Sequence, residues 1–578
     1  MSSINKIICN KEETLLHTLK IFDEAPEFGL PAGIVIVVDG EGKVFGTVTE
    51  GDVRRGLLSG FSLDSPLSEV MNSNPIMFES TYTLKEIAEK IPDELEKRNR
   101  KSRRFLGKIL IVNKDREPIK VLEYHELWEQ KVATHRHLVV VGLGYVGLTM
   151  AVVMADAGFQ VTGVEVSKER CEMLKNGNSY IHEIGLQELL REHIHRNFKV
   201  ANTLPEDGDV FIISVGTPVE LSPNGKKQPI MKYLDEACAG IGSRLKRGNL
   251  VILRSTVPIG TCRNFVKAKL EEASGLVCGV DFNLAFAPER TAEGKALKEL
   301  RSLPQIIGGY NSDSLEATAA IFRDLTPTIV KVDSLEAAEM AKLINNSFRD
   351  YIFAYSNQIA KIAANFNIDV FGVIKAANEG YVRDPVPLPS PGVGGPCLTK
   401  DPYIFASVAE MKSFDSSIFI HGRRINESMH DHVFERVNSQ LTQVGKDLSS
   451  SRILLVGLAF KGNPETGDIR NSSAVEIGLL FLQKGASVTA YDPVAVVEEI
   501  KEYGFTPVPL TNAFVGVDAV LFLNNHKSFE KIDMFKAVRE MNENPIVFDG
   551  WNAFRAEDIV ATRASVYMNL SLLKSSLS

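Results

Sequence analysis

The pattern of hydrophobic and polar residues is most regular from residue 137 onward. A continuous apolar run at 138–141 predicts a strand buried on both faces, an apolar helix continues to Ala157, and a second strand covers 160–166. Further buried strands are predicted at 209–215, 250–255, 284–287, 305–307 and 328–332. Buried strands that alternate with helices predict an α/β fold with a parallel, doubly wound sheet of the Rossmann type.

The same pattern returns near the C-terminus. Apolar runs at 452–456, 487–491, 519–523 and 546–548 predict a second Rossmann-like doubly wound sheet. Between the two sheets, residues 334–367 are rich in Ala, Glu, Lys and Asn at helical spacing. This stretch predicts one long central helix of about 50 Å, which joins the two sheets.

The first 132 residues have a different, duplicated pattern. A buried strand at 34–39, an acidic turn and a second strand at 44–48 precede a helix from Asp52. Strand, turn and strand recur within 108–122, and a helix is predicted at 124–130. A two-stranded unit cannot cover its own hydrophobic face, so we expect the two copies to pack together as an α+β pair.

Composition narrows the class of protein. A chain of 578 residues is too long for one core, and roughly three to four domains are expected. The net charge of −8 gives no reason to expect nucleic acid or a membrane surface as a partner, and no apolar run approaches the ~18 residues that span a bilayer. The six cysteines form no CxxC pair, which suits the reducing cytoplasm and argues against a disulfide framework or a metal site.

A glycine fingerprint lies between the strand at 138–141 and the helix that follows it. Its residues are Gly142, Gly144, Tyr145, Val146 and Gly147. Glycines at this spacing let the backbone approach a pyrophosphate at a helix N-terminus, and an acid ~20 residues later, here Glu165, binds the ribose hydroxyls. The carboxylate favours NAD, although Lys168 and Arg170 nearby leave NADP open. Two later strand ends carry Thr217 and Thr256, which we expect to line the cofactor site.

The second Rossmann-like region lacks an intact fingerprint. It reads GLAFKG at 457–462, so Ala459 replaces the second glycine. The methyl group occupies space that a pyrophosphate would need, which predicts a domain adapted to another nucleotide.

Candidate chemistry centres on the segment 392–401, GVGGPCLTKD. We predict a helix from Leu398 to Met411, so that Cys397 lies at its first turn, where the helix dipole would lower the pKa of the thiol. Lys400 and Asp401 follow at i+3 and i+4, on the same face as the thiol. The alternative is a buried structural cysteine, because free cysteines are among the most buried residues.

A second polar cluster is predicted on the long helix. Lys342, Asn346 and Arg349 fall on one face, as expected for the floor of a polar site, although a solvated lysine is the simpler interpretation. Glu289 and Glu293 follow the strand at 284–287. Either of them could instead be a helix-capping acid.

These motifs together resemble the UDP-glucose/GDP-mannose dehydrogenase family over residues 137–570. They are GLGYVGL (142–148), the strand ends SVGTP and STVPIGT, APER followed by EG, AEMAKLINNSFR, PGVGGPCLTKD and GLAFKGN followed by GDIRNSS. The branch that oxidises UDP-N-acetylhexosamines is the most similar. The resemblance implies an NAD domain, a helical dimerisation centre and a nucleotide-sugar domain. It also implies a four-electron oxidation of the sugar C6 alcohol to a carboxylate, with two NAD reduced.

The resemblance also implies roles for single residues. Cys397 is the nucleophile that would form a thiohemiacetal and then a thioester, Lys342 and Asn346 stabilise negative charge on the C6 oxygen, and Asp401 positions water or helps proton transfer. Glu289 is implicated in thioester hydrolysis. The remaining implied contacts are Glu293 near the nicotinamide, Lys400 and Lys461 on the diphosphate or sugar, Arg383 across a dimer, and Arg470 near the cofactor.

This sequence departs from the family pattern at two places. Pro396 precedes the cysteine where the related branch often has His, and Trp551-Asn552 stand where some members have an arginine pair. These departures leave the identity of the sugar open. Two other functions remain possible from the residues: a β-hydroxyacid-type dehydrogenase, or a catalytically inactive nucleotide-sensing scaffold.

Residues 1–132 resemble a pair of CBS domains, which are not part of the usual family architecture. In CBS domains a Thr and an Asp at a strand exit hold an adenine nucleotide, and here they are Thr49 and Asp52. The second copy reads EYHE at 123–126 and departs from this pattern. A dimerisation device without a ligand is the alternative. We therefore predict domains at 1–132, 133–332, 333–445 and 446–578.

Overall fold

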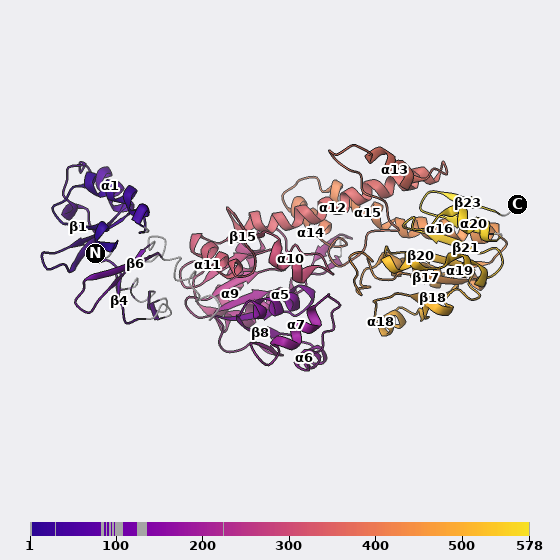
Figure 1. Cartoon of the computed structure of the whole chain (residues 1–578), viewed down its shortest axis with the longest axis horizontal. Helices are drawn as coiled ribbons and strands as arrows, with labels where there is room; N and C mark the ends of the chain where they lie inside the picture. The colour runs from indigo at the N-terminus through magenta and orange to yellow at the C-terminus, as the bar shows by residue number, and fades with distance from the viewer. Residues whose placement is uncertain are drawn as a thin grey trace.

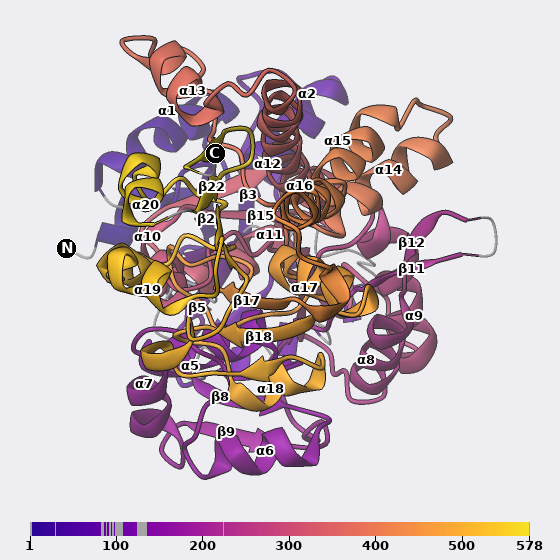
Figure 2. The same cartoon turned by 90° about the vertical axis from the view of Figure 1, so that its right-hand side faces the viewer.

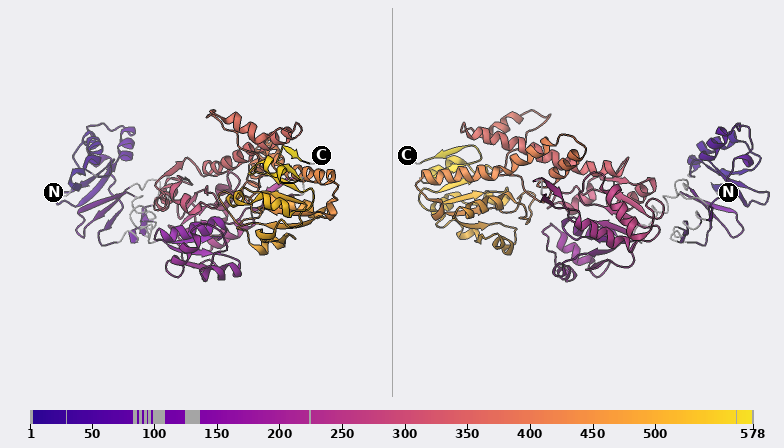
Figure 3. Two further views of the ribbon diagram at one scale, coloured as in Figure 1. Left: turned by 45° about the vertical axis from the view of Figure 1, so that its right-hand side comes forward. Right: turned by 180° about the vertical axis from the view of Figure 1, so that it is seen from behind.

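The computed structural model describes residues 3–28, 30–82, 86–87, 90–91, 94, 97–98, 108–123, 136–222, 225–563 and 565–576 (Figure 1). The two small N-terminal sheets lie at one end of the molecule, and the C-terminal sheet lies at the other (Figure 3). The predicted helix at 124–130 falls outside the described residues.

The N-terminal region is duplicated, as predicted. Its two three-stranded sheets have the orders β1-β2-β3 and β4-β5-β6, and in each the first pair is parallel and the second antiparallel. The register shifts at the same place in both, between Val37 and Val38 and between Ile111 and Val112. The strands are β1 (Ile8–Asn10), β2 (Ile34–Val38), β3 (Val44–Thr49), β4 (Met77–Glu79), β5 (Lys108–Val112) and β6 (Pro118–Glu123), and α1 (Leu15–Glu24) and α2 (Glu50–Leu58) accompany the first sheet.

The turns that join the antiparallel strands repeat in the same way. The side chain of Asp39 accepts hydrogen bonds from the backbone N–H groups of Glu41 and Lys43, and Asn113 accepts the equivalent pair from Asp115 and Glu117. The two sheets also touch, because the N–H of Val44 donates to the carbonyl of Arg116 across 2.9 Å. The two copies therefore form one paired unit.

An eight-stranded sheet with the order β16-β15-β14-β13-β10-β7-β8-β9 follows. Its neighbouring strands are parallel except β14 and β15. Its strands are β7 (His137–Val141), β8 (Gln160–Val164), β9 (Phe198–Ala201), β10 (Val210–Ile213), β13 (Leu250–Leu253), β14 (Asn283–Phe286), β15 (Gln305–Gly309) and β16 (Ile329–Val332). The helices are α5 (Tyr145–Asp156), α6 (Lys168–Lys175), α7 (Leu186–His193), α8 (Lys232–Gly242), α9 (Lys267–Ser274), α10 (Ala296–Ser302) and α11 (Ser312–Arg323).

The helix after the glycine fingerprint, α5, is buried in the hydrophobic core beside this sheet. Nine consecutive residues of α5, from Gly147 to Ala155, are buried, which explains why the helix is apolar on every side. The sequence did not predict β9 or the antiparallel hairpin of β11 (Val219–Leu221) and β12 (Lys227–Pro229), which projects from the sheet beside α14 (Figure 2).

One helix of 30 residues, α12 (Leu335–Ala364), runs along the upper side of the molecule in Figure 1 from the first Rossmann-like sheet to the second. Ser334 caps its N-terminus by accepting a hydrogen bond from the N–H of Ala337, so the predicted long helix is confirmed within three residues at each end. The helices α13 (Val370–Asn378), α14 (Asp401–Met411), α15 (Ser417–Glu427) and α16 (Met429–Gln443) complete the central region.

The second Rossmann-like sheet has the order β19-β18-β17-β20-β21-β22-β23 and is parallel except for its last pair. The strands are β17 (Arg452–Val456), β18 (Ser487–Tyr491), β19 (Thr506–Pro507), β20 (Ala519–Phe522), β21 (Ile546–Asp549), β22 (Val566–Met568) and β23 (Leu573–Ser575). The helices are α17 (Ser473–Gln483), α18 (Val497–Glu502), α19 (Met534–Glu540) and α20 (Ala556–Thr562). Across the described ranges, no helix is both long and apolar enough to cross a bilayer.

Candidate functional site

The turn between β7 and α5 fits the pyrophosphate of a dinucleotide. Gly142 has a φ of +89°, and a Cβ at Gly147 would lie 1.8 Å from the carbonyl oxygen of Gly142, so neither position accepts a side chain. A Cβ at Gly144 would meet no atom within 4 Å. The space over Gly144, at the N-terminus of α5, is therefore open for a phosphate.

Glu165, directly after β8, is positioned for a ribose. It is 6% exposed, and its Oε1 accepts a hydrogen bond from the N–H of Ser167 across 2.9 Å. The hydroxyl of Tyr180 donates to the carbonyl of Leu143 and lies 3.5 Å from Oε2 of Glu165. The Arg170 guanidinium lies over the Tyr180 ring, 5.0 Å from its centre.

The two threonines predicted at strand ends contact each other. Thr217 follows β10, and its hydroxyl donates to the carbonyl of Thr256, which follows the neighbouring strand β13, across 2.5 Å. Both therefore lie at the carboxyl edge of the sheet, where doubly wound folds bind their ligands. The residues at this edge fit NAD.

Cys397 does not lie in the first turn of a helix, and that prediction was wrong. The helix α14 begins at Asp401, and the N–H groups of Lys400 and Asp401 both donate to the carbonyl of Cys397 in the preceding turn. All six cysteines are described, and only Cys397 is exposed. The prediction of a buried structural cysteine therefore does not apply.

The pKa of the Cys397 thiol is raised and not lowered as predicted. Although the residue is exposed, protein packed around the sulfur raises its pKa, and the negative charge of Asp401 adds to the effect. The positive charges of Lys342 and Lys400 oppose it, and Glu293 also acts on the thiol. These four charged side chains converge on the thiol from three parts of the chain.

Asp401 binds two other polar side chains near the thiol. Its carboxylate is completely buried, with Oδ1 accepting from Lys400 Nζ across 2.7 Å and Oδ2 accepting from Asn346 Nδ2 across 2.5 Å. Lys342, one turn before Asn346 on α12, donates through Nζ to the backbone carbonyl of Glu289. Burial lowers the pKa of Lys461, and the charge of the exposed Arg349 acts in the same direction, whereas Glu293 and Glu183 oppose the shift.

The carboxylate of Glu289 is bound by Arg254 and by two backbone N–H groups. Burial acts to raise its pKa, but the buried guanidinium of Arg254, the N–H of Thr291 and the charge of Lys342 together hold the pKa below its usual value. Arg254 Nη2 lies 2.5 Å from Oε2, and the N–H groups of Arg290 and Thr291 both donate to Oε1 across 2.7 Å. The hydrogen bond from Lys342 goes to the backbone carbonyl of Glu289.

Glu293 joins the two Rossmann-like domains. Its Oε2 accepts from the hydroxyl of Thr466 across 3.1 Å, and its carbonyl accepts from Lys461 Nζ across 2.8 Å. Burial and the charge of Asp468 raise the pKa of Glu293 to about 7, although Lys461 opposes the shift. Arg470 binds Asp468 through Nε and Nη2.

Glu183, which fixes the loop that carries Glu293, was not predicted from the sequence. Its two carboxylate oxygens accept from the N–H of Gly294 across 2.6 Å and from the N–H of Ala296 across 2.9 Å. The hydroxyl of Tyr145 also donates to Glu183. Glu183 therefore links this loop to the glycine fingerprint, over a separation of more than 100 residues that a local pattern does not reveal.

The turn after β17 in the second Rossmann-like sheet differs from the turn between β7 and α5. The helix α17 begins only at Ser473, and Oδ2 of Asp492 accepts hydrogen bonds from the N–H groups of Leu458 and Ala459 across 2.7 and 2.9 Å. A carboxylate from the chain itself thus occupies the donors that a pyrophosphate would use. This geometry supports the interpretation that the domain is adapted to another nucleotide.

Two groups of predicted site residues lie apart from the thiol. Arg383 is exposed on the loop between α13 and α14. Thr49 and Asp52 form a capping box at the start of α2, with the Thr49 hydroxyl donating to Asp52 Oδ2 across 2.7 Å and Arg55 pairing with Oδ1. In the described ranges, no three His, Cys, Asp or Glu side chains are placed to hold a metal.

Three family models match the chain in order. They are the NAD binding domain of the UDP-glucose/GDP-mannose dehydrogenase family at 136–326, its central domain at 336–428 and its UDP binding domain at 454–556. The chain belongs to this family. It is an NAD-dependent oxidoreductase that acts on a CH–OH group of a nucleotide sugar. A CBS domain model matches residues 1–59, which contain the first of the two N-terminal copies.

Relatives within the family are similar along most of their length. The UDP-N-acetyl-D-mannosamine dehydrogenase of Methanococcus maripaludis is 32% identical over 419 residues, which are 72% of this chain and 93% of the relative. The enzyme of the same name from Campylobacter jejuni is 32% identical over 409 residues, 69% of this chain and 97% of the relative.

Solved structures of similar dehydrogenases have the same fold over most of this chain. The UDP-D-ManNAc dehydrogenase of Pyrococcus horikoshii superposes with a TM-score of 0.67 at 30% identity, over 75% of this chain and 99% of that one. The UDP-N-acetyl-mannosamine dehydrogenase of Staphylococcus aureus gives 0.65 at 33%, over 75% and 98%. The family assignment decides against the β-hydroxyacid alternative.

Proposed function

We propose that this protein oxidises the C6 alcohol of a UDP-N-acetylhexosamine to the uronic acid, with UDP-N-acetyl-D-mannosamine as its substrate. The observation that carries the proposal is the exposed thiol of Cys397 with Lys342, Lys400, Asp401 and Glu293 acting on it. The similar proteins named for UDP-N-acetylmannosamine support the choice of sugar.

The thiol supplies the covalent step. Cys397 attacks the C6 aldehyde formed by the first oxidation, so that an S–C6 bond forms and the carbonyl electrons move to oxygen. The ammonium of Lys342 and the amide of Asn346 stabilise that oxygen. Oxidation of the thiohemiacetal gives a thioester, and water then breaks the S–C6 bond to release the carboxylate and the thiol. Bound NAD supplies the electron acceptor for both oxidations, held by the Gly142–Gly147 turn, Glu165, Thr217 and Thr256.

The carboxylates take different roles. Asp401 fixes Lys400 and Asn346, since its two oxygens are already bonded to them. Glu293, with a pKa of about 7, can accept and return a proton at neutral pH, as an acid–base group must. Glu289 stays ionised beside Arg254 and acts on the reaction through its carbonyl, which holds Lys342. Lys461 and Arg470, beside Glu293 and Asp468, are suited to the charged parts of the substrate and cofactor.

We also propose that the protein is a homodimer or a higher homo-oligomer built on α12. One face of this helix exposes large apolar side chains at intervals of three, four or seven residues: Met340, Ile344, Phe348, Tyr351, Tyr355 and Ile362. An apolar stripe of this length is typical of a protein interface. Arg383, exposed on a nearby loop, is then available to the sugar nucleotide of the second copy. The proposed domain boundaries are those predicted above, with 1–132 as a regulatory unit.

The N-terminal unit is proposed to bind an adenine nucleotide at Thr49 and Asp52. The match to a CBS domain over residues 1–59 and the position of Thr49 and Asp52 at the N-terminus of α2 support this. The capping box would have to share Asp52 with a ribose and Thr49 with a phosphate. A nucleotide bound there can shift the dehydrogenase between conformations only by its differential affinity for them, typically ~1–3 kcal/mol.

NADH absorbance with a panel of UDP- and GDP-sugars tests the substrate. UDP-N-acetyl-D-mannosamine should give the highest kcat/KM and a uronic acid product. A higher value for UDP-glucose or GDP-mannose would exclude the proposed sugar. No turnover with any sugar would favour the inactive scaffold.

Titration calorimetry tests the regulatory site. ATP, ADP and AMP are titrated into the full chain, with NAD present to fill the cofactor site. Binding should disappear in Asp52→Ala and persist in Asp23→Ala, which removes an exposed carboxylate on α1 that lies outside the cap. Absence of binding to the unmodified chain would leave only a structural role for the unit.

A further inference from the structure

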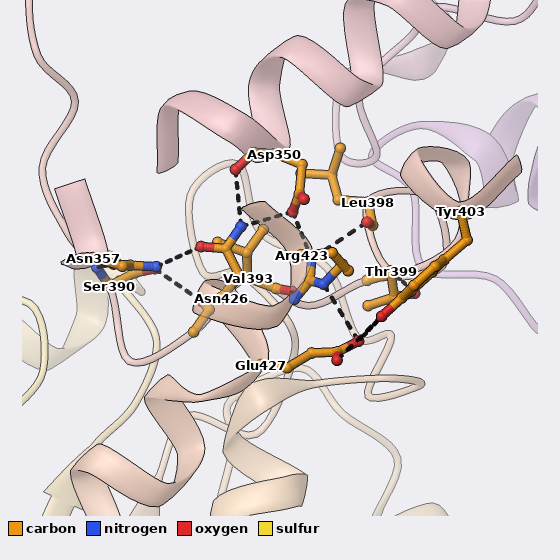
Figure 4. A network of polar contacts seen from close by, with 12 residues as sticks. Asp350, Asn357, Ser390, Val393, Leu398, Thr399, Tyr403, Arg423, Asn426 and Glu427 are labelled. Atoms are coloured by element: carbon orange, nitrogen blue, oxygen red, sulfur yellow. Dashed lines mark hydrogen bonds and ion pairs between the residues drawn. The ribbon is translucent and has the colours of Figure 1, made fainter. Parts of the chain in front are cut away.

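A buried arginine on α15 connects the thiol loop to the helix that carries Lys342 and Asn346. Arg423 is 1% exposed, which is unusual for a guanidinium. Its Nη1 lies 2.6 Å from Oδ1 of Asp350, and Asp350 is likewise 1% exposed (Figure 4). A buried charge pair of this kind needs further hydrogen bonds to offset its desolvation.

Those further bonds go to the loop of Cys397. Arg423 Nη2 donates to the carbonyl of Val393 across 2.7 Å, and Nη1 donates to the carbonyl of Leu398 across 3.3 Å. The two carbonyls lie on either side of Cys397 in sequence. One planar guanidinium therefore holds both arms of the loop that presents the thiol (Figure 4).

Asp350, the carboxylate partner of Arg423, lies on the same helix as two residues of the cluster around the thiol. Lys342, Asn346 and Asp350 follow at intervals of four residues, so they lie along one face of α12. Asp350 is thus the third member of a row whose first two members are proposed to stabilise the substrate oxygen. The guanidinium sets the distance between this row and the thiol loop.

The start of the loop is held by the same network. Asn426, one turn after Arg423, donates to Oδ1 of Asp350 across 2.8 Å and accepts from Asn357 Nδ2 across 2.9 Å. Asn357 Oδ1 accepts from the N–H of Ser390 across 2.8 Å. Each of these groups has a partner within the network.

We propose that Arg423 is a positioning residue for Cys397, which holds the thiol against Lys342, Asn346 and Asp401 by binding the carbonyls of Val393 and Leu398 and the carboxylate of Asp350. The inference rests on the proposed function, because it assigns the thiol as the nucleophile. A lysine keeps the charge but cannot reach three acceptors in fixed directions, so Arg423→Lys should loosen the loop without emptying the site.

Alkylation of Cys397 tests the proposal without substrate. The other five cysteines are buried, so iodoacetamide labels Cys397 selectively. The pH at which the alkylation rate is half of its maximum, here called the midpoint, reports the ionisation of the thiol. In Arg423→Lys the midpoint should fall toward that of a free cysteine, and the rate at pH 8 should rise at least threefold. Labelling must stay confined to Cys397, since general unfolding would expose the other thiols.

Kinetics gives the second readout. In Arg423→Lys, kcat should fall at least tenfold, whereas the KM values for NAD and the UDP-sugar should stay within about twofold, because the binding residues are untouched. Arg436→Lys is the matched control, since Arg436 donates to the carbonyl of Leu572, away from the thiol loop, and should change neither readout.

An unchanged alkylation midpoint in folded Arg423→Lys would overturn the proposal. If that variant does not fold, Glu427→Gln decides, because Glu427 lies 3.5 Å from Arg423 Nε and is partly exposed. It should move the midpoint in the same direction by a smaller amount, and an unchanged midpoint would again overturn the proposal. If the unmodified protein turns over no sugar, the proposed function fails, while the alkylation comparison still decides the role of Arg423.

Discussion

Gly144 and Gly147 lie in the same turn but meet different surroundings, so one substitution at each position separates cofactor binding from folding. A Cβ at Gly147 would lie 1.8 Å from the Gly142 carbonyl and 3.3 Å from Cβ of Ser214. The carbonyl or the start of α5 would have to move by about 1.5 Å to restore an ordinary contact, an overpacking that costs about 2–3 kcal/mol. For a domain of ~200 residues this lowers Tm by about 4–12 °C.

Gly144→Ala should leave the fold intact. The position is open, and its φ of −58° is accessible to alanine, so the change in stability should be about 1 kcal/mol or less. The methyl group does occupy the space left for the pyrophosphate. We expect Kd for NAD to rise at least tenfold, a loss of about 1.4 kcal/mol.

Thermal unfolding with and without NAD measures both effects. At 100 times the wild-type Kd, NAD stabilises the wild type by about 2.7 kcal/mol, whereas a tenfold weaker variant gains only about 1.4 kcal/mol. Titration calorimetry gives Kd directly. The reasoning is refuted if Gly144→Ala binds NAD as tightly as the wild type, or if it lowers Tm without ligand as much as Gly147→Ala does.

Three further predictions concern single carboxylates. Glu165→Ala should narrow the preference for NAD over NADP in kcat/KM, because it removes both a ribose acceptor and the repulsion of a 2′-phosphate; equal values already in the wild type would contradict the assignment. Since burial and Asp468 raise the pKa of folded Glu293 from 4.5 to about 7, the free energy of unfolding should fall as pH rises from about 4.5 to about 7. In urea titrations, Glu293→Gln should therefore show a smaller fall in the free energy of unfolding over this pH range. Some fall should remain in both proteins, because burial also raises the pKa of Glu339 to about 7. Identical pH profiles for the variant and the wild type would contradict this prediction. Asp492→Ala should destabilise the C-terminal domain by about 1–3 kcal/mol, because the N–H groups of Leu458 and Ala459 lose their acceptor, and an unchanged urea midpoint for that domain would count against it.

Local patterns were sufficient where the structure depends on neighbours in sequence. The strand, glycine turn and helix at 137–157 and the long helix α12 follow from apolar runs and helical spacing. The short strands β9, β19, β22 and β23 were missed, because strands of two to four residues carry little periodic signal. The start of α14 was predicted three residues too early, since the Cys397 carbonyl closes a separate turn before it.

The site was predicted only in part, for a related reason. Cys397, Lys400 and Asp401 share one motif, whereas the contacts of Glu183 with Gly294 and of Arg423 with Asp350 join residues 111 and 73 positions apart. A polar residue on an amphipathic helix is normally assigned to solvent, and only the packed structure shows that Arg423 is buried. The raised pKa of Cys397 likewise depends on surrounding protein that the sequence does not reveal.

The most direct test of the central claim is the number of NADH formed for each UDP-N-acetyl-D-mannosamine consumed, compared between the wild type and Cys397→Ser. If the thiol carries a four-electron oxidation, the wild type should form two NADH and one uronic acid for each sugar. The serine variant should bind NAD and sugar but release no acid, because its alkoxide is a poorer nucleophile and leaving group at neutral pH. One NADH for each sugar in the wild type, or normal acid formation by Cys397→Ser, would contradict the account.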